Sequence, residues 1–315
     1  MKLLISRRLP ESVMQATEAR FDVTCRATTL PMTQEDSVAA LAEYDAVLPT
    51  LGDAFRAEAF AAVPDPRCKL LANFGAGFNH IDVAAARAAG IAVTNTPGAV
   101  TDSTADIALT LILMTARRAG EGERLVRSGG WTGWHPTQLL GMHVSGKTVC
   151  IIGMGRIGQA IARRCHFGFG CRVVYVNRSV KAVDFPAEQM QMADALAVAD
   201  VVVVATPGGA ETHHLVGAEV FAAMQPHAIF ANIARGDIVD EAALIAALQA
   251  GRIAGAGLDV YEFEPEVPAA LKAMENVTLL PHLGTSALGP REDMGRMALD
   301  NIIAFAEGRD LPNPV

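Results

Sequence analysis

Three observations predict an α/β protein built from doubly wound parallel sheets. Short runs of β-branched and other apolar residues alternate with alanine-rich segments of helical length along nearly the whole chain. The short runs are almost continuously apolar, which is typical of parallel strands that are covered on both faces. The chain has 315 residues, of which 51% are hydrophobic and 19% charged, so it can fold into two globular domains.

Ten of the apolar runs are expected to be strands: Lys2–Ser6, Ala46–Pro49, Leu70–Phe74, Ile91–Asn95, Thr148–Ile152, Arg172–Val176, Val201–Thr206, Ala228–Ile233, Ala254–Val260 and Val277–Leu280. The expected helices between them include Gln34–Glu43, Val83–Ala89, Ile157–Cys165, Ala218–Met224 and Glu241–Gln249. A long apolar helix through Ile107–Met114 would sit well between two domains. If the last helical run, Arg291–Glu307, packs on the first third of the chain, one domain is an insertion into the other.

Charge and cysteine content exclude several classes of protein. A net charge of -8 argues against nucleic-acid binding, which needs clustered Lys and Arg. No apolar segment approaches the roughly 20 residues that span a membrane, and the apolar stretch at the N-terminus is too short for a signal peptide. The five cysteines form no C-x-x-C pair, so we expect no metal site and a cytoplasmic protein with reduced thiols.

The run T-V-C-I-I-G-M-G-R-I-G predicts a dinucleotide site, because Gly153, Gly155 and Gly158 follow a strand and begin a helix. The first glycine permits a tight turn, the second permits backbone to approach a pyrophosphate, and the third permits close helix–strand packing. A glycine-rich turn without a ligand is the alternative interpretation.

The next strand ends in Asn177, Arg178 and Ser179, where an NAD-specific site has a carboxylate for the ribose hydroxyls. These side chains offer hydrogen-bond donors, and an arginine can bind a phosphate through two parallel hydrogen bonds. The sequence therefore predicts NADP as the preferred cofactor. NAD stays possible if Asn177 only satisfies a turn.

Three later strands end in residues that can do chemistry: Arg235, then Asp259 and Glu264, then His282. An arginine can hold a carboxylate, a histidine can give or take a proton, and a nearby glutamate can stabilise the imidazolium. Each residue alone has a structural explanation, but their position at successive strand ends favours a catalytic set. The adjacent His213 and His214 have no carboxylate at metal-ligand spacing and are expected on a loop surface.

These motifs resemble the D-isomer-specific 2-hydroxyacid dehydrogenases. The resemblance rests on Gly153-Met-Gly-Arg-Ile-Gly158, Asn232-x-x-Arg-Gly236, Gly257-Leu-Asp-Val260 with Glu264-Pro265, and Pro281-His-x-Gly284, with further matches at Leu71–Asp82 and Asn95–Asp106. Gly130–Thr137, G-R-I-G-Q-A and N-R-S look most like the glyoxylate/hydroxypyruvate reductases of that family.

The resemblance implies a Rossmann cofactor domain (99–286) inserted into a discontinuous flavodoxin-like substrate domain (1–98 and 287–315). It implies reduction of a small 2-oxo acid, with Arg235 holding the substrate, His282 as general acid and Glu264 supporting it. It implies substrate contacts from Leu51, Gly52, Gly75, Ala76, Gly77, Trp134 and Arg291. It implies cofactor contacts from Thr104, Arg156, Ile157, Thr206, Pro207, Thr212, Ile233, Ala234, Asp259 and Gly284, besides the glycine loop and residues 177–179.

In this family Trp134 would reach the active site of a partner subunit, which implies a homodimer. Glu264 argues against the formate dehydrogenases, which resemble this chain but have a glutamine there. Gly289–Pro290 departs from the threonine-rich helix start of the family, which leaves the presentation of Arg291 open. Phosphite oxidation, and a cofactor-gated interaction module like the C-terminal binding proteins, are the alternative functions.

Overall fold

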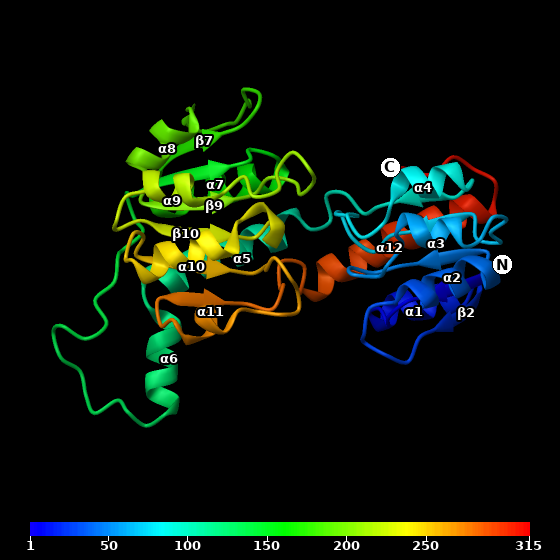
Figure 1. The fold of residues 1–315 in the computed structure, drawn as a ribbon, viewed down its shortest axis with the longest axis horizontal. Coiled ribbons are helices and arrows are strands. Elements are labelled where there is room, and N and C mark those ends of the chain that lie inside the picture. The colour runs from blue at the N-terminus through cyan, green and yellow to red at the C-terminus, as the bar shows by residue number, and fades with distance from the viewer. The chain divides into compact units, whose positions relative to one another are not determined.

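The computed structural model describes residues 1–315, which form two compact units (Figure 1). Unit 1 comprises residues 1–100 and 286–315, and unit 2 comprises residues 101–285. Both units are parallel sheets with helices on both faces, which confirms the predicted fold class. No helix is both long and apolar enough to cross a membrane.

Unit 1 contains a five-stranded parallel sheet in the order β2-β1-β3-β4-β5, which is the flavodoxin-like order. Its strands are β1 (Lys2–Ile5), β2 (Asp22–Cys25), β3 (Ala46–Leu48), β4 (Leu70–Ala72) and β5 (Ala92–Thr94). Its helices are α1 (Glu11–Glu18), α2 (Gln34–Glu43), α3 (Ala57–Ala61), α4 (Val83–Ala88) and α12 (Leu288–Ala306).

Alternate residues of the unit 1 strands face two separate cores. Leu4 and Val47 pack with α2, α3 and α4, whereas Leu3 and Leu48 pack with α1 and α12. A Cβ on Gly295 of α12 would lie 2.5 Å from the side chain of Val13 in α1, so glycine is needed for this contact. The last helix therefore packs on the beginning of the chain, and both chain ends build unit 1.

Unit 2 contains a seven-stranded parallel sheet in the order β12-β11-β10-β9-β6-β7-β8. Its strands are β6 (Thr148–Ile152), β7 (Arg172–Val176), β8 (Ala187–Gln189), β9 (Val201–Val204), β10 (Ile229–Asn232), β11 (Gly255–Leu258) and β12 (Val277–Leu279). Its helices are α5 (Thr101–Ala116), α6 (Ala119–Arg127), α7 (Arg156–Phe169), α8 (Met192–Val198), α9 (Ala218–Ala223), the 3-10 helix η1 (Gly236–Ile238), α10 (Glu241–Gln249) and α11 (Ala269–Ala273).

The order of strands in unit 2 reverses between β6 and β9, as in a Rossmann sheet. α5 and α7 cover one face of this sheet, and α8, α9 and α10 cover the other. Ligands of such sheets bind beyond the carboxyl ends of the strands, at the reversal point. In unit 2 that edge carries the loops after β6, β9, β10, β11 and β12.

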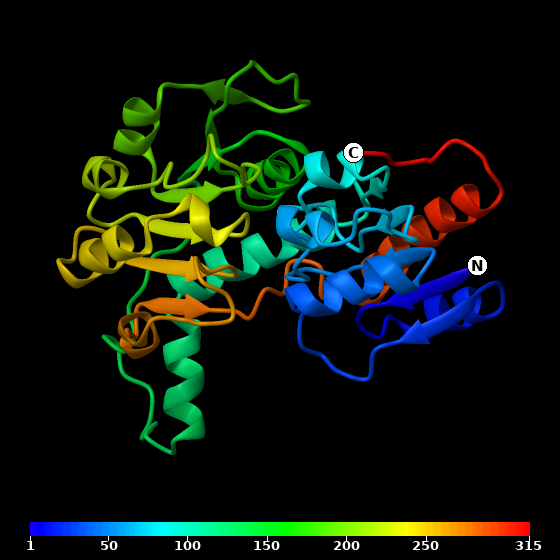
Figure 2. The same cartoon turned by 45° about the vertical axis from the view of Figure 1, so that its right-hand side comes forward.

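The helix α6 and the segment 128–146 extend away from the rest of unit 2 (Figures 1 and 2). No side chain of α6 is buried. Four large apolar side chains on this arm are exposed, namely Val126 (60%), Trp131 (53%), Trp134 (79%) and Leu140 (66%). Exposed apolar groups gathered on one arm are typical of a protein interface.

All ten predicted strands are present, most of them one or two residues shorter than predicted. The structure adds β2 and β8, which the sequence analysis missed. Each lies at the edge of its sheet and is only partly buried, so neither contains the continuous apolar run that marks the central strands.

Candidate functional site

The three glycines of the loop after β6 have the three different environments that a dinucleotide site needs. Gly153 has φ +100°, and a Cβ there would lie 2.6 Å from the backbone nitrogen of Thr206. A Cβ on Gly158 would lie 2.1 Å from the carbonyl oxygen of Gly153, so the helix packs directly on the turn. A Cβ on Gly155 would meet nothing within 4 Å, which leaves open space beside the loop.

The N-terminus of α7 is free to bind an anion. No side chain caps this helix, whose N-cap residue is Gly155. Arg156 is exposed and Ile157 half-buried in the first turn. The uncapped amides and the helix dipole favour negative charge at this end, so the loop fits a pyrophosphate.

The tip of β7 is ordered by Asn177. Its side-chain oxygen accepts a hydrogen bond from the amide of Met154 (3.2 Å), and its nitrogen donates to the carbonyl of Ser179 (2.8 Å). Arg178 is 90% exposed and forms an ion pair with Glu211 (3.0 Å), which sequence analysis did not identify. The tip of β7 thus carries one cation, Arg178, and its ion pair with Glu211 is exposed, so another anion can replace Glu211.

The turn after β10 is fixed by Asn232 and Gly236. The buried Asn232 side chain accepts a hydrogen bond from the amide of Ala234 (3.0 Å) and donates one to the carbonyl of Arg235 (2.9 Å). A Cβ on Gly236 would lie 1.8 Å from the carbonyl carbon of Tyr261. Only glycine therefore lets this turn pack against the backbone after β11.

The segment after β11 carries Glu264 and Asp259. One oxygen of Glu264 accepts a hydrogen bond from the amide of Tyr261 (3.0 Å). The Tyr261 hydroxyl donates to the carbonyl of Leu280 (3.0 Å) and so ties this segment to the end of β12. Each of these contacts reduces the freedom of the Glu264 carboxylate.

The loop after β12 is held by the buried carboxylate of Asp259. Its two oxygens accept hydrogen bonds from the amides of Leu283 (2.6 Å) and Gly284 (2.8 Å). Burial raises the pKa of Asp259, although the two amides and the charge of His282 oppose the rise. His282 has φ +54°, an unfavourable conformation for a non-glycine residue, and its amide donates to the carbonyl of Asp259 (2.9 Å).

The structure brings Glu264 and His282 into direct contact. Nδ1 of His282 lies 2.8 Å from Oε2 of Glu264. A carboxylate only accepts hydrogen bonds, so Nδ1 carries a proton and Nε2 is the nitrogen that can gain and release one. Burial alone would raise the pKa of Glu264, but the hydrogen bond and charge of His282, with help from Tyr261 and Arg235, lower it.

Arg235 is a cation without a carboxylate partner in the chain. Its Nη1 donates to the carbonyl of Ala234 (2.6 Å), and no Asp or Glu forms an ion pair with it. Burial lowers the pKa of its guanidinium, while the charges of Glu264 and Asp237 act against that shift. Arg235 is half-buried, and a partly desolvated cation without a carboxylate partner favours an anion beside it.

The remaining residues expected to contact the cofactor lie on or near the same edge of unit 2. Thr206 packs over Gly153, and the Thr212 hydroxyl donates to the carbonyl of Pro207 (2.8 Å). Ile233 and Thr104 are buried, and the Thr104 hydroxyl donates to the carbonyl of Gly284 (3.2 Å). The Asp259 oxygens already accept hydrogen bonds from two backbone amides, so this residue also holds the loop after β12 in place.

In unit 1, residues 75–77 form a loop with free amides. Asn73 donates to the carbonyls of Gly75 and Gly77 (3.0 Å each), and Asn95 donates to the carbonyl of Ala76 (2.8 Å). The amides of Ala76 and Gly77 have no acceptor within the chain. Two such adjacent amides can bind an anion.

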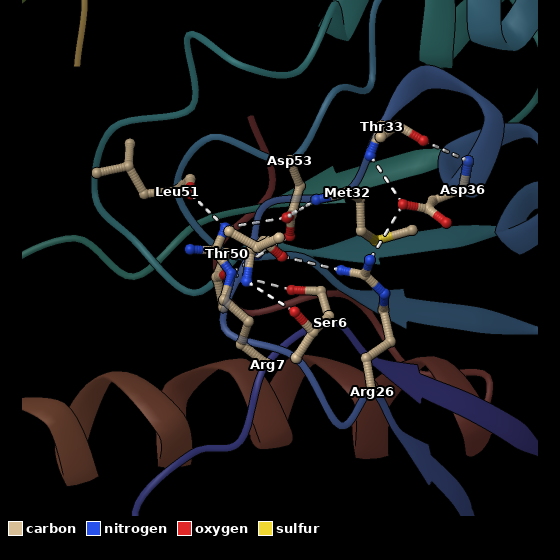
Figure 3. Close-up of polar contacts among 11 residues, drawn as sticks. Ser6, Arg7, Arg26, Met32, Thr33, Asp36, Thr50, Leu51 and Asp53 are labelled. Carbon is tan, nitrogen blue, oxygen red and sulfur yellow. Dashed lines mark hydrogen bonds and ion pairs between the residues drawn. The ribbon is translucent and has the colours of Figure 1, made fainter. Parts of the chain in front are cut away.

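The turn at Leu51 and Gly52 depends on a buried charge pair that sequence analysis missed (Figure 3). Asp53 is fully buried and accepts hydrogen bonds from the amides of Thr50 (2.7 Å) and Met32 (2.8 Å) and from Arg7 (3.0 Å). The same Arg7 nitrogen donates to the carbonyl of Leu51. Arg7 follows β1 and Asp53 follows β3, and the adjacency of these two strands could have indicated the pair.

Trp134 and Arg291 lie in different settings. Trp134 is on the arm described above and is exposed. Arg291 is in the first turns of α12, where its guanidinium donates to the hydroxyl of Ser286 (2.8 Å). Pro290 is tolerated there because the first amides of a helix have no partner within it.

Comparison with known proteins identifies the family. Residues 109–284 match the family model "D-isomer specific 2-hydroxyacid dehydrogenase, NAD binding domain". A glyoxylate reductase of Thermococcus onnurineus is 41% identical over 321 aligned positions that cover all of this chain and 95% of that protein. This chain belongs to the D-isomer specific 2-hydroxyacid dehydrogenases.

Solved structures of this dehydrogenase family agree with the fold. A D-isomer specific 2-hydroxyacid dehydrogenase of Polaromonas, described as putative, has a TM-score of 0.93 at 33% identity and is covered to 99%. An NADPH-dependent glyoxylate/hydroxypyruvate reductase of Sinorhizobium meliloti, in complex with NADP and malonate, has a TM-score of 0.86 at 34% identity and is covered to 96%. Both structural alignments include the whole of this chain.

We predict that Gly236→Ala damages both stability and catalysis. The new Cβ would collide with the backbone at Tyr261, which cannot move without displacing Glu264. Urea denaturation should give a free energy of unfolding lower by about 3 kcal/mol, and kcat/KM should fall about 100-fold. Gly168→Ala in α7 is the matched control, because nothing lies within 4 Å of its Cβ position. Equal behaviour of the two variants would contradict this role of Gly236.

The lowered pKa of Glu264 predicts a pH-dependent contribution to stability. A carboxyl group whose pKa is lower in the folded protein stabilises it above the unfolded value, about pH 4.3 for glutamate, and loses that contribution as the pH falls through the folded value. The urea midpoint of the wild type should therefore exceed that of Glu264→Gln by more at about pH 5.5 than at about pH 3.5, which lies below the unfolded value. A constant difference at both pH values would refute this assignment.

Proposed function

We propose that this dehydrogenase reduces a small 2-oxo acid, such as glyoxylate or hydroxypyruvate, to the D-2-hydroxy acid with NADPH. The observation that carries the proposal is Arg235, a half-buried cation with no carboxylate partner, beside the hydrogen-bonded pair of Glu264 and His282. The substrate supplies the missing carboxylate. Similarity to glyoxylate reductases and to a glycerate dehydrogenase of Hyphomicrobium methylovorum (36% identity) supports this substrate class.

In the proposed reaction, Arg235 binds the substrate carboxylate and 2-oxo group and keeps the carbonyl polarised. The nicotinamide, when bound, supplies a hydride to the carbonyl carbon. Nε2 of His282 gives a proton to the carbonyl oxygen, while Glu264 on Nδ1 orients the ring and stabilises its charged form. The sum is 2-oxo acid, NADPH and one proton giving the D-2-hydroxy acid and NADP.

Unit 1 would supply backbone contacts and one arginine, Arg291, to the substrate. The free amides of Ala76 and Gly77 suit one carboxylate oxygen, and the turn of Leu51 and Gly52, held by Arg7, suits another. Arg291 would also contact the substrate. Phosphite, the alternative substrate, is also an anion but has no carbonyl group. Assays with each compound therefore separate 2-oxo acid reduction from phosphite oxidation.

The cofactor would bind to unit 2. The amides after Gly153 and Gly155, with Arg156 and Ile157, would hold the pyrophosphate, in the space that the absent Cβ of Gly155 leaves. The nicotinamide half would contact Thr104, Thr206, Pro207, Thr212, Ile233, Ala234, Asp259 and Gly284.

We infer a preference for NADPH from the tip of β7. Asn177, Arg178 and Ser179 place donors and one cation where a 2′-phosphate would bind, and no carboxylate of β7 repels it. Glu211 competes for Arg178 in the free protein, but both side chains are more than 80% exposed, so their pairing is weak.

We also propose a homodimer. The exposed apolar side chains of the arm, Trp134 above all, would be covered by a second copy, and Trp134 would enter the partner's active site. Light scattering of the purified protein tests this, and the mass of a single chain would contradict it.

The function predicts distinct effects for two variants. Arg235→Gln should raise KM for the 2-oxo acid and lower kcat/KM by about 100-fold, with a smaller loss in Arg235→Lys, because lysine keeps the charge but not the paired hydrogen bonds. His282→Gln should lower kcat by about 100-fold or more. Initial rates of NADPH oxidation measure both. Wild-type rates in either variant, or no turnover of any 2-oxo acid by the wild type, would refute the proposal.

Glu211→Gln should improve the use of NADPH. Removal of the competing carboxylate frees Arg178, and the KM for NADPH should fall by about two- to fivefold while the KM for NADH stays unchanged. Arg178→Gln should raise the KM for NADPH by about tenfold or more. If Arg178→Gln raises the KM values for NADPH and NADH equally, other residues determine the cofactor preference.

A further inference from the structure

Outside the proposed catalytic pair, His213, His214 and Glu262 form a second cluster of functional side chains. Their potential ligand atoms all lie within 4.8 Å of one another. The sequence predicts that the two histidines lie on a loop surface without a carboxylate neighbour at metal-ligand spacing. Both histidines are exposed on that loop, as expected, but the absence of a carboxylate neighbour is wrong, because the loop after β11 brings Glu262 to the loop after β9 from 48 residues further along the chain.

The cluster is ordered by contacts with the protein. Nε2 of His214 lies 2.7 Å from Oε1 of Glu262, whose side chain is only 14% exposed. The rings of His213 and His214 stack with centroids 4.0 Å apart. His214 has φ +50°, and its amide donates to the carbonyl of Asp237 (2.9 Å), which holds it in this conformation.

The charge around Glu262 favours a cation. The amide of Glu262 donates to Oε1 of the buried Glu241 (3.2 Å), so a second carboxylate lies beside the first. Neither glutamate forms an ion pair with a lysine or arginine, and His214 is the one basic partner of Glu262. Two carboxylates without a fixed positive charge give this corner a negative potential.

We propose that His213, His214 and Glu262 bind a divalent transition-metal ion, with Zn²⁺ as the best fit. Two imidazole nitrogens and one carboxylate oxygen form a common three-ligand zinc set, which leaves a fourth position for water. The ion would replace the His214–Glu262 hydrogen bond. Imidazole binds a metal only when its ligand nitrogen is deprotonated, so affinity falls as the solution is acidified.

A bound ion would connect loops that have no covalent link. His213 and His214 follow the segment of Thr206 and Thr212, and Glu262 precedes Glu264 by two residues. The metal would therefore join the loop after β9 to the loop that carries the partner of His282. Binding to the folded state alone also raises thermal stability.

Isothermal titration of the untagged full chain with ZnCl₂ near neutral pH tests the site. His213→Gln, His214→Asn and Glu262→Gln each remove one ligand, and asparagine tolerates the positive φ of residue 214. We expect one strong zinc site in the wild type and a zinc affinity at least about tenfold weaker in each variant. Loss of a residue that only hydrogen-bonds a metal ligand already weakens metal binding by about tenfold or more. The Co²⁺ form should show the visible absorption of a four-coordinate ion.

Two controls exclude binding elsewhere. His227→Asn removes a histidine that pairs with Asp200 at 2.8 Å and has no second histidine beside it, so it should leave zinc affinity unchanged. His282→Asn removes the proposed catalytic histidine and should also leave it unchanged. Retention of full affinity in the His213→Gln/His214→Asn double variant, or its loss in His282→Asn, would overturn the proposal. Neither result depends on turnover, so the test is independent of the proposed function.

Discussion

The buried carboxylate of Asp259 is the contact on which the candidate site depends most. It accepts two consecutive amides from the loop after β12, and its own carbonyl accepts the amide of His282. These three hydrogen bonds offset the unfavourable backbone conformation of His282 and bring its ring to Glu264. Without them, the histidine would sit on a flexible loop and lose its partner.

Parallel register explains why distant residues meet at this edge. Asn232 pairs with Leu258, and Leu258 pairs with Leu279, so β10, β11 and β12 end at the same level. The turn of Arg235, the segment of Glu264 and the loop of His282 then leave the sheet side by side. Gly236 permits the close contact between the first two, and the loop after β6 brings the dinucleotide site to the same sheet edge.

The sequence predicts the central strands and the residues at their ends, because buried parallel strands are apolar and the groups that follow them are not. The edge strands β2 and β8 lack that pattern. The pairing of Arg7 with Asp53, and of His214 with Glu262, joins residues more than 40 positions apart, which meet only because the fold places the loops that carry them side by side. For the same reason, the competition of Glu211 for Arg178 emerges only from the structure.

In the proposed reaction, the site transfers a hydride to the carbonyl carbon of a 2-oxo acid and a proton to its oxygen. Reduction of hydroxypyruvate with NADPH deuterated at the transferring position of the nicotinamide ring tests it directly. We expect D-glycerate with deuterium at C2 from the wild type, and little product from His282→Gln in the same time. Product without the label, or the L-isomer, would contradict it.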